Sequence, residues 1–200
     1  ALSAYTIHDA KAFRDALISR GVSTLTVKRN FAVVRSIWNL SAREHGINKP
    51  NPFANMHYGT GVEPVKRMPV PIDSIRLVQN ECMKLDDDIR WLIALISDTG
   101  MRLAEATGLR ISDLHLEEDI PFVRLEEHVS RPLKTAGSRR DIPLVGSSLW
   151  AVQRAAAEND GPFLFPRYCS VTKCKADYAS NTLNKWMKPF VPEGCVIHSF

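Results

Sequence analysis

Arg102 follows Gly100 by two residues and precedes Glu105 by three, a spacing that suggests either an ion pair or an anion-binding site. A helix is expected to begin after Gly100 with Arg102 in its first turn, where a positive charge opposes the helix dipole. On such a helix Glu105 is close enough to steady the guanidinium. One interpretation is a structural ion pair. The other is an anion site, because the planar guanidinium matches the oxygens of a phosphate group.

A second group of cations lies between residues 129 and 143, which hold four Lys or Arg side chains and one acid. Two extended segments flank a Thr-Ala-Gly-Ser turn at residues 135–138, and this pattern predicts a hairpin. Lys134 is expected at its tip, beside Arg139 and Arg140. Charge also keeps an exposed hairpin from aggregating, which is a sufficient explanation for the two arginines. Protection against aggregation does not depend on the position of the lysine, so it does not explain why Lys134 lies at the tip.

The elements that must position these groups are mainly helices. The apolar run at 91–96 predicts a buried helix that stops at Gly100, since glycine suits the left-handed residue past a helix end. The next helix is expected to bury Leu103, Ala106 and Thr107. Other helices are expected at 6–20, with Phe13, Leu17 and Ile18 on the buried side, at 23–45, at 72–85, from Ser147 or Ser148 to 157, and from Ser180 onward, with Leu183 and Trp186 inward.

The Asp triplet at 86–88 is interpreted as capping charge at the start of the buried helix. Consecutive helical residues point in different directions, so three chelating carboxylates are not expected there. We expect neither a metal nor another cofactor. The four cysteines show no metal-site spacing and no dense disulfide pattern, which favours reduced thiols and a cytoplasmic protein. No apolar run approaches the roughly 20 residues of a transmembrane helix, and no signal peptide opens the chain.

The net charge of +4 is unevenly placed. Residues 1–65 hold eight Lys or Arg against four Asp or Glu, and residues 66–200 hold eighteen of each. On the helix at 23–45, Lys28, Arg35 and Arg43 are expected to share the face opposite the apolar residues, with Arg29 near its edge. Solvation is one explanation for that face, and contact with the DNA backbone is the one we favour. A basic, Gly- and Pro-rich stretch at 55–71 predicts a linker after this unit.

Three short motifs and the organisation of the first unit carry a resemblance to a known family. Thr99-Gly100-Met101-Arg102-Leu103-Ala104-Glu105 resembles the first catalytic-arginine box of the tyrosine recombinases, the phage-integrase family. Lys134-Thr135, a short turn and Ser-Arg-Arg-x-Ile-Pro-Leu resemble the hairpin that carries the family's catalytic lysine. His198-Ser199-Phe200 resembles the first three positions of the family's His-x-x-Arg box. The helical first unit, its Asn-Pro-Phe close and the basic linker resemble the family's core-binding domain.

The resemblance implies a mainly α protein with a small antiparallel β-sheet, an α+β fold. Residues 1–64 would form a helical, SAM-like core-binding domain, and residues 65–200 a catalytic integrase domain. The implied function is site-specific DNA recombination or integration through a 3′-phosphotyrosyl intermediate, as in a phage or other mobile element. Arg102 would bind the phosphate, and Glu105 would orient the arginine side of the site. Lys134 would be the general acid, and His198 would donate to the phosphate or relay a proton. The expected DNA contacts are Lys28, Arg29, Arg35, Arg43, Arg139 and Arg140.

The family's second arginine, its later His or Trp and its nucleophilic tyrosine are expected beyond Phe200. All four tyrosines of the chain precede His198, so this piece is expected to bind duplex DNA without cleaving it. The longer protein is expected to assemble on DNA, as a tetramer in its synaptic complex, and not on a membrane. A non-catalytic helical DNA-binding protein is the alternative, which would leave Arg102, Lys134 and His198 unexplained. A metal-dependent nuclease would need clustered carboxylates, and none is convincingly spaced.

Overall fold

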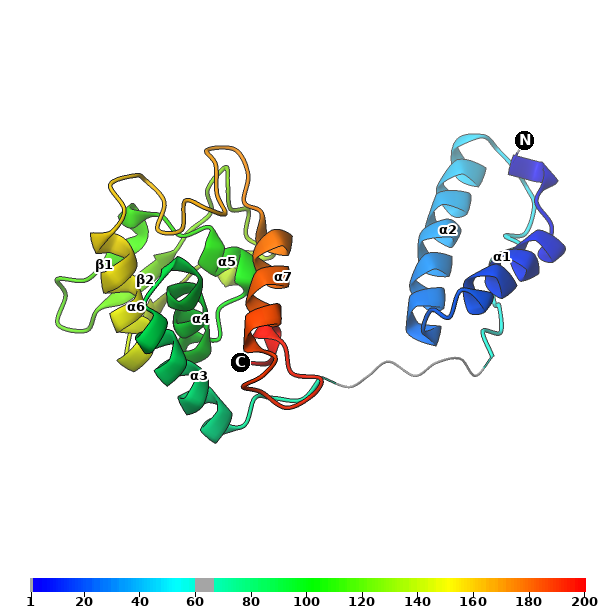
Figure 1. Ribbon diagram of the computed structural model, residues 1–200. Coiled ribbons are helices and arrows are strands. Elements are labelled where there is room, and N and C mark those ends of the chain that lie inside the picture. Colours follow the sequence, from blue (N-terminus) through cyan, green and yellow to red (C-terminus); the bar gives the residue numbers. More distant parts are fainter. Residues whose placement is uncertain (1, 60–66) are drawn as a thin grey trace. The chain divides into compact units, whose positions relative to one another are not determined.

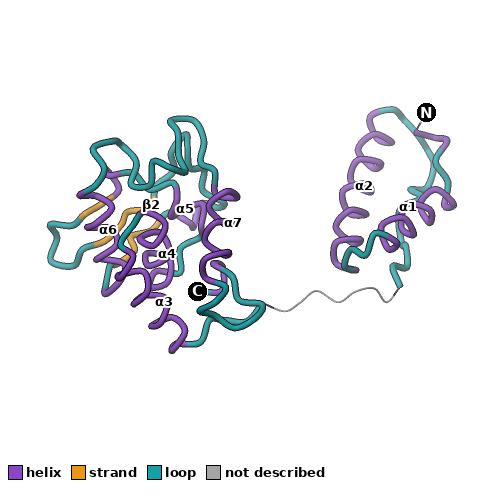
Figure 2. Tube along the Cα trace, in the orientation of Figure 1, coloured by secondary structure: helices purple, strands orange, loops and turns teal. Residues whose placement is uncertain are grey.

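The computed structural model describes residues 2–59 and 67–200, and the chain divides into two compact units, Ala1–Lys66 and Arg67–Phe200. Helices predominate in both units, and the strands form one small sheet (Figure 2). The predicted mainly α fold with a small antiparallel sheet is therefore confirmed. The predicted domain boundary at 64/65 and the middle of the predicted linker lie outside the described residues.

The first unit packs α1 (Ile7–Ser19) against α2 (Thr24–Glu44), after a short 3₁₀ helix, η1 (Leu2–Ala4). The Thr6 side chain caps α1 in a capping box with Asp9, and Ser23 caps α2. Ile18 was expected to be buried but is 40% exposed, because it lies about 100° around the helix from the buried Leu17. The core of the unit consists of Ala10, Leu17, Val27, Phe31, Trp38, Phe53 and Met56.

The second unit is built around α4 (Asp88–Thr99), whose residues 91–96 are all buried as predicted. Asp87 caps this helix with its side chain, and Gly100 ends it in the left-handed region at φ 59°. The helices α3 (Ile72–Leu85), α5 (Leu103–Thr107), α6 (Gly146–Ala157) and α7 (Ala176–Met187) pack against α4 (Figure 1). As predicted, Leu103, Ala106 and Thr107 of α5 are buried.

Three predicted helix starts need correction. Arg102 is the N-cap residue of α5 and not part of its first turn. The N-cap of α6 is Val145, whose backbone N–H donates to the Ser148 hydroxyl at 3.0 Å, so this serine caps from inside the first turn. The last helix, α7, begins at Ala176, four residues before the expected Ser180.

The sheet is antiparallel in the order β1-β2-β3, with β1 (Leu114–His115), β2 (Phe122–Leu125) and β3 (Arg140–Pro143). Short 3₁₀ helices lie before β1, at η2 (Ile111–Asp113), before β3, at η3 (Ala136–Ser138), and at η4 (Ile197–Ser199). The predicted hairpin is wrong in its first arm. Residues 131–133 form no strand, because β3 pairs with β2 and residues 126–139 become a long connection between them.

The prediction of reduced thiols is wrong for two of the four cysteines. Cys169 and Cys174 form a disulfide, because a backbone turn pairs them as an antiparallel bridge with their Cα atoms 4.3 Å apart. Cys82 and Cys195 are free. Cys82 is buried in the core, and this burial raises the pKa of its thiol to about 12.

Candidate active site

Arg102 and Glu105 form an ion pair at the start of α5, at 2.7 Å between Arg102 Nη1 and Glu105 Oε1. The second carboxylate oxygen accepts from the Arg102 backbone N–H at 3.1 Å and from Arg140 Nη2 at 2.9 Å. The Glu105 side chain is 6% exposed and that of Arg102 is 52% exposed. Glu105 therefore holds the inner side of the guanidinium while its outer side stays open to a ligand.

The pKa of Glu105 reflects two opposing causes. Burial alone would raise the pKa, but hydrogen bonds from Arg140, from the Arg102 side chain and from the Arg102 backbone bring it below its ordinary value. Glu105 is therefore an anion at neutral pH. It neutralises part of the charge of two guanidinium groups that would otherwise repel one another.

Arg140 was predicted to contact DNA, but its guanidinium lies against Glu105 and also donates to the Ser138 backbone carbonyl at 2.9 Å. Its side chain is 36% exposed. Arg139 also has a carboxylate partner, Glu126, but its side chain is 72% exposed. The structure therefore gives Arg140 a bracing contact, while Arg139 points its charge at the surface.

Ser138 joins Arg102 to the segment that carries Lys134. Its buried hydroxyl accepts from Arg102 Nη1 at 3.3 Å and lies 3.0 Å from the Thr135 hydroxyl, next to Lys134 in sequence. Ser138 was not among the predicted site residues. The sequence around Ser138 contains no local pattern that identifies Arg102, 36 residues away, as its partner.

A cavity of about 470 Å³ brings Arg102 together with His198. Arg102 comes from the start of α5 and His198 from η4, and the first two turns of α7 supply Asp177 and Ser180. Both Arg102 and His198 are exposed, so their polar atoms are available to a ligand. The complete lining is Arg67, Arg102, Leu103, Ala104, Ala176, Asp177, Ser180 and His198.

Lys134 lines a different cavity of about 620 Å³, on the connection between β2 and β3. Its neighbours there include Glu126, Glu127 and Arg139. The lysine is exposed. The structure thus places two of the three predicted catalytic side chains in one cavity and links the third to them through Thr135 and Ser138.

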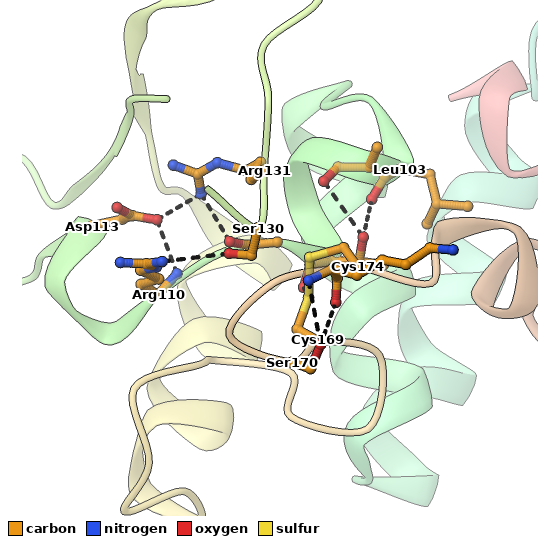
Figure 3. The surroundings of a disulfide bond; sticks show 12 residues. Leu103, Arg110, Asp113, Ser130, Arg131, Cys169, Ser170 and Cys174 are labelled. Atoms are coloured by element: carbon orange, nitrogen blue, oxygen red, sulfur yellow. Dashed lines mark hydrogen bonds and ion pairs between the residues drawn. A yellow bond between two sulfur atoms is a disulfide. The ribbon is translucent and has the colours of Figure 1, made fainter. Parts of the chain in front are cut away.

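A buried arginine anchors this connection to the end of α5. Arg131 donates to the Gly108 carbonyl at 3.1 Å, to Asp113 Oδ2 at 2.6 Å and to the Glu126 carbonyl. Asp113 also accepts from the Arg110 backbone N–H, and its other oxygen lies 2.8 Å from His128 Nε2. Figure 3 shows the Arg131 guanidinium directed at Asp113 and the Arg110 guanidinium directed at Ser130, near the Cys169–Cys174 loop. A Cβ at Gly108 would lie 2.8 Å from Arg131, so the fit is close.

The cations predicted on the first unit lie on α2. Lys28, Arg29 and Arg43 are exposed and Arg35 is half-buried. Within the described residues none of the four forms an ion pair. The surface of α2 is less polar than expected, because four apolar side chains are also more than 40% exposed: Leu25, Val33, Ile37 and Leu40.

Metal sites and membrane-spanning helices can both be recognised from the geometry of a structure. Among the residues that the structure describes, no group of three or more His, Cys, Asp and Glu side chains is arranged to hold a metal ion. No helix in the described ranges is long and apolar enough to cross a membrane.

No family model matches the chain. A curated relative, the tyrosine recombinase XerC of Oceanobacillus iheyensis, is 27% identical over 126 residues, which cover 60% of this chain and 39% of that protein. The chain therefore matches well under half the length of this relative.

Solved structures share the fold. The integrase of the Tn1549 transposon, in complex with circular intermediate DNA, is 18% identical with a TM-score of 0.71, over 100% of this chain and 71% of that one. A lambda integrase dimer bound to a COC' core site is 13% identical with a TM-score of 0.69, over 98% and 55%. At these identities the likeness shows a common fold, in which both halves of this chain take part.

Proposed function

We propose that the chain is part of a site-specific DNA recombinase of the tyrosine recombinase family. The similarity to a curated tyrosine recombinase and the fold shared with two integrases support this proposal. The observation that carries the proposal is the cavity shared by Arg102 and His198, with buried Glu105 behind the arginine. Two side chains that can donate to phosphate oxygens line this cavity, although they are 96 residues apart in sequence.

In this proposal a tyrosine hydroxyl attacks a DNA phosphodiester. The phenolic proton is released to water as a bond forms between the phenolic oxygen and phosphorus. The bond from phosphorus to the 5′-oxygen breaks, and a 3′-phosphotyrosyl link and a 5′-hydroxyl, protonated by Lys134, result. Negative charge grows on the non-bridging oxygens in the transition state. Arg102 and His198 donate to those oxygens, and Glu105 fixes the guanidinium beforehand so that little reorganisation is needed.

Lys134 protonates the departing 5′-oxygen. In the structure Lys134 lines a different cavity, so the proposal requires the connection between β2 and β3 to bring it toward the phosphate when DNA binds. Catalytic contacts that are long in a free enzyme often tighten only in the complex with substrate. The link from Arg102 through Ser138 to Thr135 gives this movement a fixed pivot.

The nucleophile of the proposal follows Phe200 in a longer protein. Tyr5 and Tyr58 belong to the first unit, Tyr168 is buried, and Tyr178 is exposed on α7 without lining the cavity. Duplex DNA is the proposed partner, with assembly into a tetramer on DNA and a cytoplasmic location, as in a phage or mobile element. A lambda integrase tetramer has been solved on a Holliday junction, and this chain shares its fold with a TM-score of 0.68.

The test of DNA binding concerns α2. We expect the double charge reversal Lys28→Glu with Arg43→Glu to weaken duplex binding. The plot of log affinity against log salt should become less steep by about 0.9 for each phosphate that is no longer neutralised. Arg35 is left unchanged because it is half-buried. The measurement is a fluorescence-anisotropy titration at several salt concentrations.

Lys11→Glu with Arg20→Glu is the matched control, since both residues are exposed on or beside α1 and the net charge changes equally. A smaller effect in this control would locate the contact on α2. Equal effects in both variants would make the change one of net charge and would remove α2 from the proposed interface.

A further inference from the structure

The segment just before α3 is attached to the segment that carries His198. The Val70 backbone N–H donates to the Ser199 carbonyl at 3.0 Å, and the Val70 side chain is buried. The Cys195 thiol lies 3.6 Å from the Met68 carbonyl and 3.8 Å from that of Pro69. Residues 68–70 therefore follow the course of residues 195–199, although about 130 positions separate them in the sequence.

Arg67 immediately precedes this attached segment, and it lines the same cavity as Arg102 and His198. It is exposed, and within the described residues it has no hydrogen bond or ion pair. Three side chains that can donate to an anion thus line one cavity, although they come from parts of the second unit that are far apart in the sequence. Asp177 is the acid among the lining residues.

This arrangement is not explained by charge on the surface alone. The second unit, residues 67–200, has 17 Lys or Arg against 18 Asp or Glu, so a random patch of its surface is expected to have no positive excess. Around this cavity two arginines and a histidine face one aspartate. A concave site lined by an excess of one charge concentrates ligands of the opposite charge.

We infer that Arg67 binds a second phosphate of the DNA strand, next to the phosphate held by Arg102 and His198. The inference rests on the proposed function and adds to it a binding residue that lies outside the arginine box, the lysine hairpin and the histidine box. Arg102 is committed on its inner side to Glu105, whereas the Arg67 guanidinium keeps its donors for the ligand. The backbone bond between Val70 and Ser199 ties the position of this contact to that of His198.

The test uses the 200-residue chain and a mixed-sequence duplex. We expect Arg67→Gln to lower affinity several-fold and to reduce the salt slope by about 0.9, the value for one phosphate contact. Arg67→Lys, which keeps the charge, should keep most of the slope. The matched control is Arg76→Gln on α3, which removes the same charge from an exposed residue outside the cavity, paired with Asp73 at 3.6 Å.

An unchanged slope in Arg67→Gln, or an equal reduction in Arg76→Gln, would overturn the inference and leave the proposed function in place. If the slope falls as far in Arg67→Lys as in Arg67→Gln, the role of Arg67 is not that of a phosphate-binding cation. A wild-type chain with no salt-dependent binding to duplex DNA would overturn both the inference and the proposed function.

Discussion

Glu105 is a buried carboxylate between two guanidinium groups, and its position explains why α5 can present an arginine at its N-terminus. The dipole of a helix disfavours a cation there. The short bonds from Arg102 and Arg140 to Glu105 offset that effect and hold Arg102 in one orientation. Glu105 does not line the cavity, so its role is to position Arg102.

Glu105→Gln should cost about 2 kcal/mol of unfolding free energy at neutral pH, the scale of a hydrogen bond to a charged group. Because the pKa of Glu105 is lower in the folded state, its stabilisation is complete above its ordinary pKa of 4.5 and is lost as the pH falls through the folded value. The difference between wild type and variant should therefore narrow below pH 4.5. Urea unfolding from about pH 3 to about pH 7 measures it.

Glu158→Gln serves as the control, since Glu158 is a 56% exposed partner of Arg154 at 3.5 Å. Such surface pairs contribute little, so its unfolding curve should follow that of wild type. A Glu105→Gln variant whose deficit is the same at every pH would show that the carboxylate charge is not what stabilises this site.

Lys134 could bind phosphate or protonate the leaving 5′-oxygen, and both roles predict a slow Lys134→Ala variant. A 5′-thiolate leaves without a proton, whereas phosphate binding is needed for either atom. In the full-length protein, a substrate with sulfur at the bridging 5′ position should therefore restore the cleavage rate of Lys134→Ala. The same substrate should not restore Arg102→Ala, because that variant lacks a contact with non-bridging oxygens. If sulfur leaves Lys134→Ala as slow as oxygen does, Lys134 is a positioning contact.

The connection between β2 and β3 is the element on which the predicted acid depends. Arg131 is part of this connection and is 2% exposed. Its guanidinium donates to the Glu126 carbonyl at the start of the connection, to the Gly108 carbonyl after α5 and to the buried Asp113. Without Arg131 the buried Asp113 would lose its guanidinium partner and keep only the Arg110 backbone N–H and His128. The connection is therefore held at its base by Arg131 and at its far end by Ser138.

Arg131→Met should lower the unfolding free energy by about 3 kcal/mol, because removing one partner leaves a buried charge uncompensated. Amide hydrogen exchange should show the greatest decrease of protection in residues 126–139. Arg124→Met is the matched control, since Arg124 pairs with Asp141 on the surface of the same sheet, 43% exposed. Similar exchange in the two variants would mean that Arg131 does not anchor this connection.

The helices and some of their ends were predictable because their signals are local, although the starts of α5, α6 and α7 were not. Thr6, Ser23, Asp87 and Gly100 each fix a helix end through neighbours within four residues. The partner of β3 was not predictable in this way, since it depends on pairing across a connection of fourteen residues. The same holds for the disulfide, whose spacing of five residues carries no distinctive pattern.

The site was predictable in part, and the reason lies in the same distinction. Arg102, Lys134 and His198 stand in segments that resemble family motifs, so their candidacy could be read from the sequence. Ser138 stands in the hairpin motif and Arg67 in the basic linker, but their roles, like that of Arg131, depend on partners that are distant in sequence and that no local pattern identifies. Arg140 was given an outward role because its contact with Glu105 depends on the folded sheet.

On the scale of the whole chain, charge is distributed in two ways. Residues 1–65 carry a net excess of four positive charges, which gives the first unit a broad attraction to a polyanion. The second unit has no positive excess, with 17 Lys or Arg against 18 Asp or Glu, but it gathers Arg67, Arg102 and His198 around one cavity. In the proposed function the first unit supplies affinity for the backbone of duplex DNA, and the second selects a single phosphate for reaction.

The formation of a covalent protein–DNA adduct tests the central claim most directly. Duplexes recovered by binding selection, nicked so that the released 5′-hydroxyl fragment diffuses away, would be incubated with the full-length protein in the presence of a metal chelator. We predict an adduct on the 3′-phosphate for the wild type and none for Arg102→Ala, although that variant should still bind the duplex. Cleavage that requires a divalent metal and leaves no adduct, or an equal adduct yield from Arg102→Ala, would contradict the proposed chemistry.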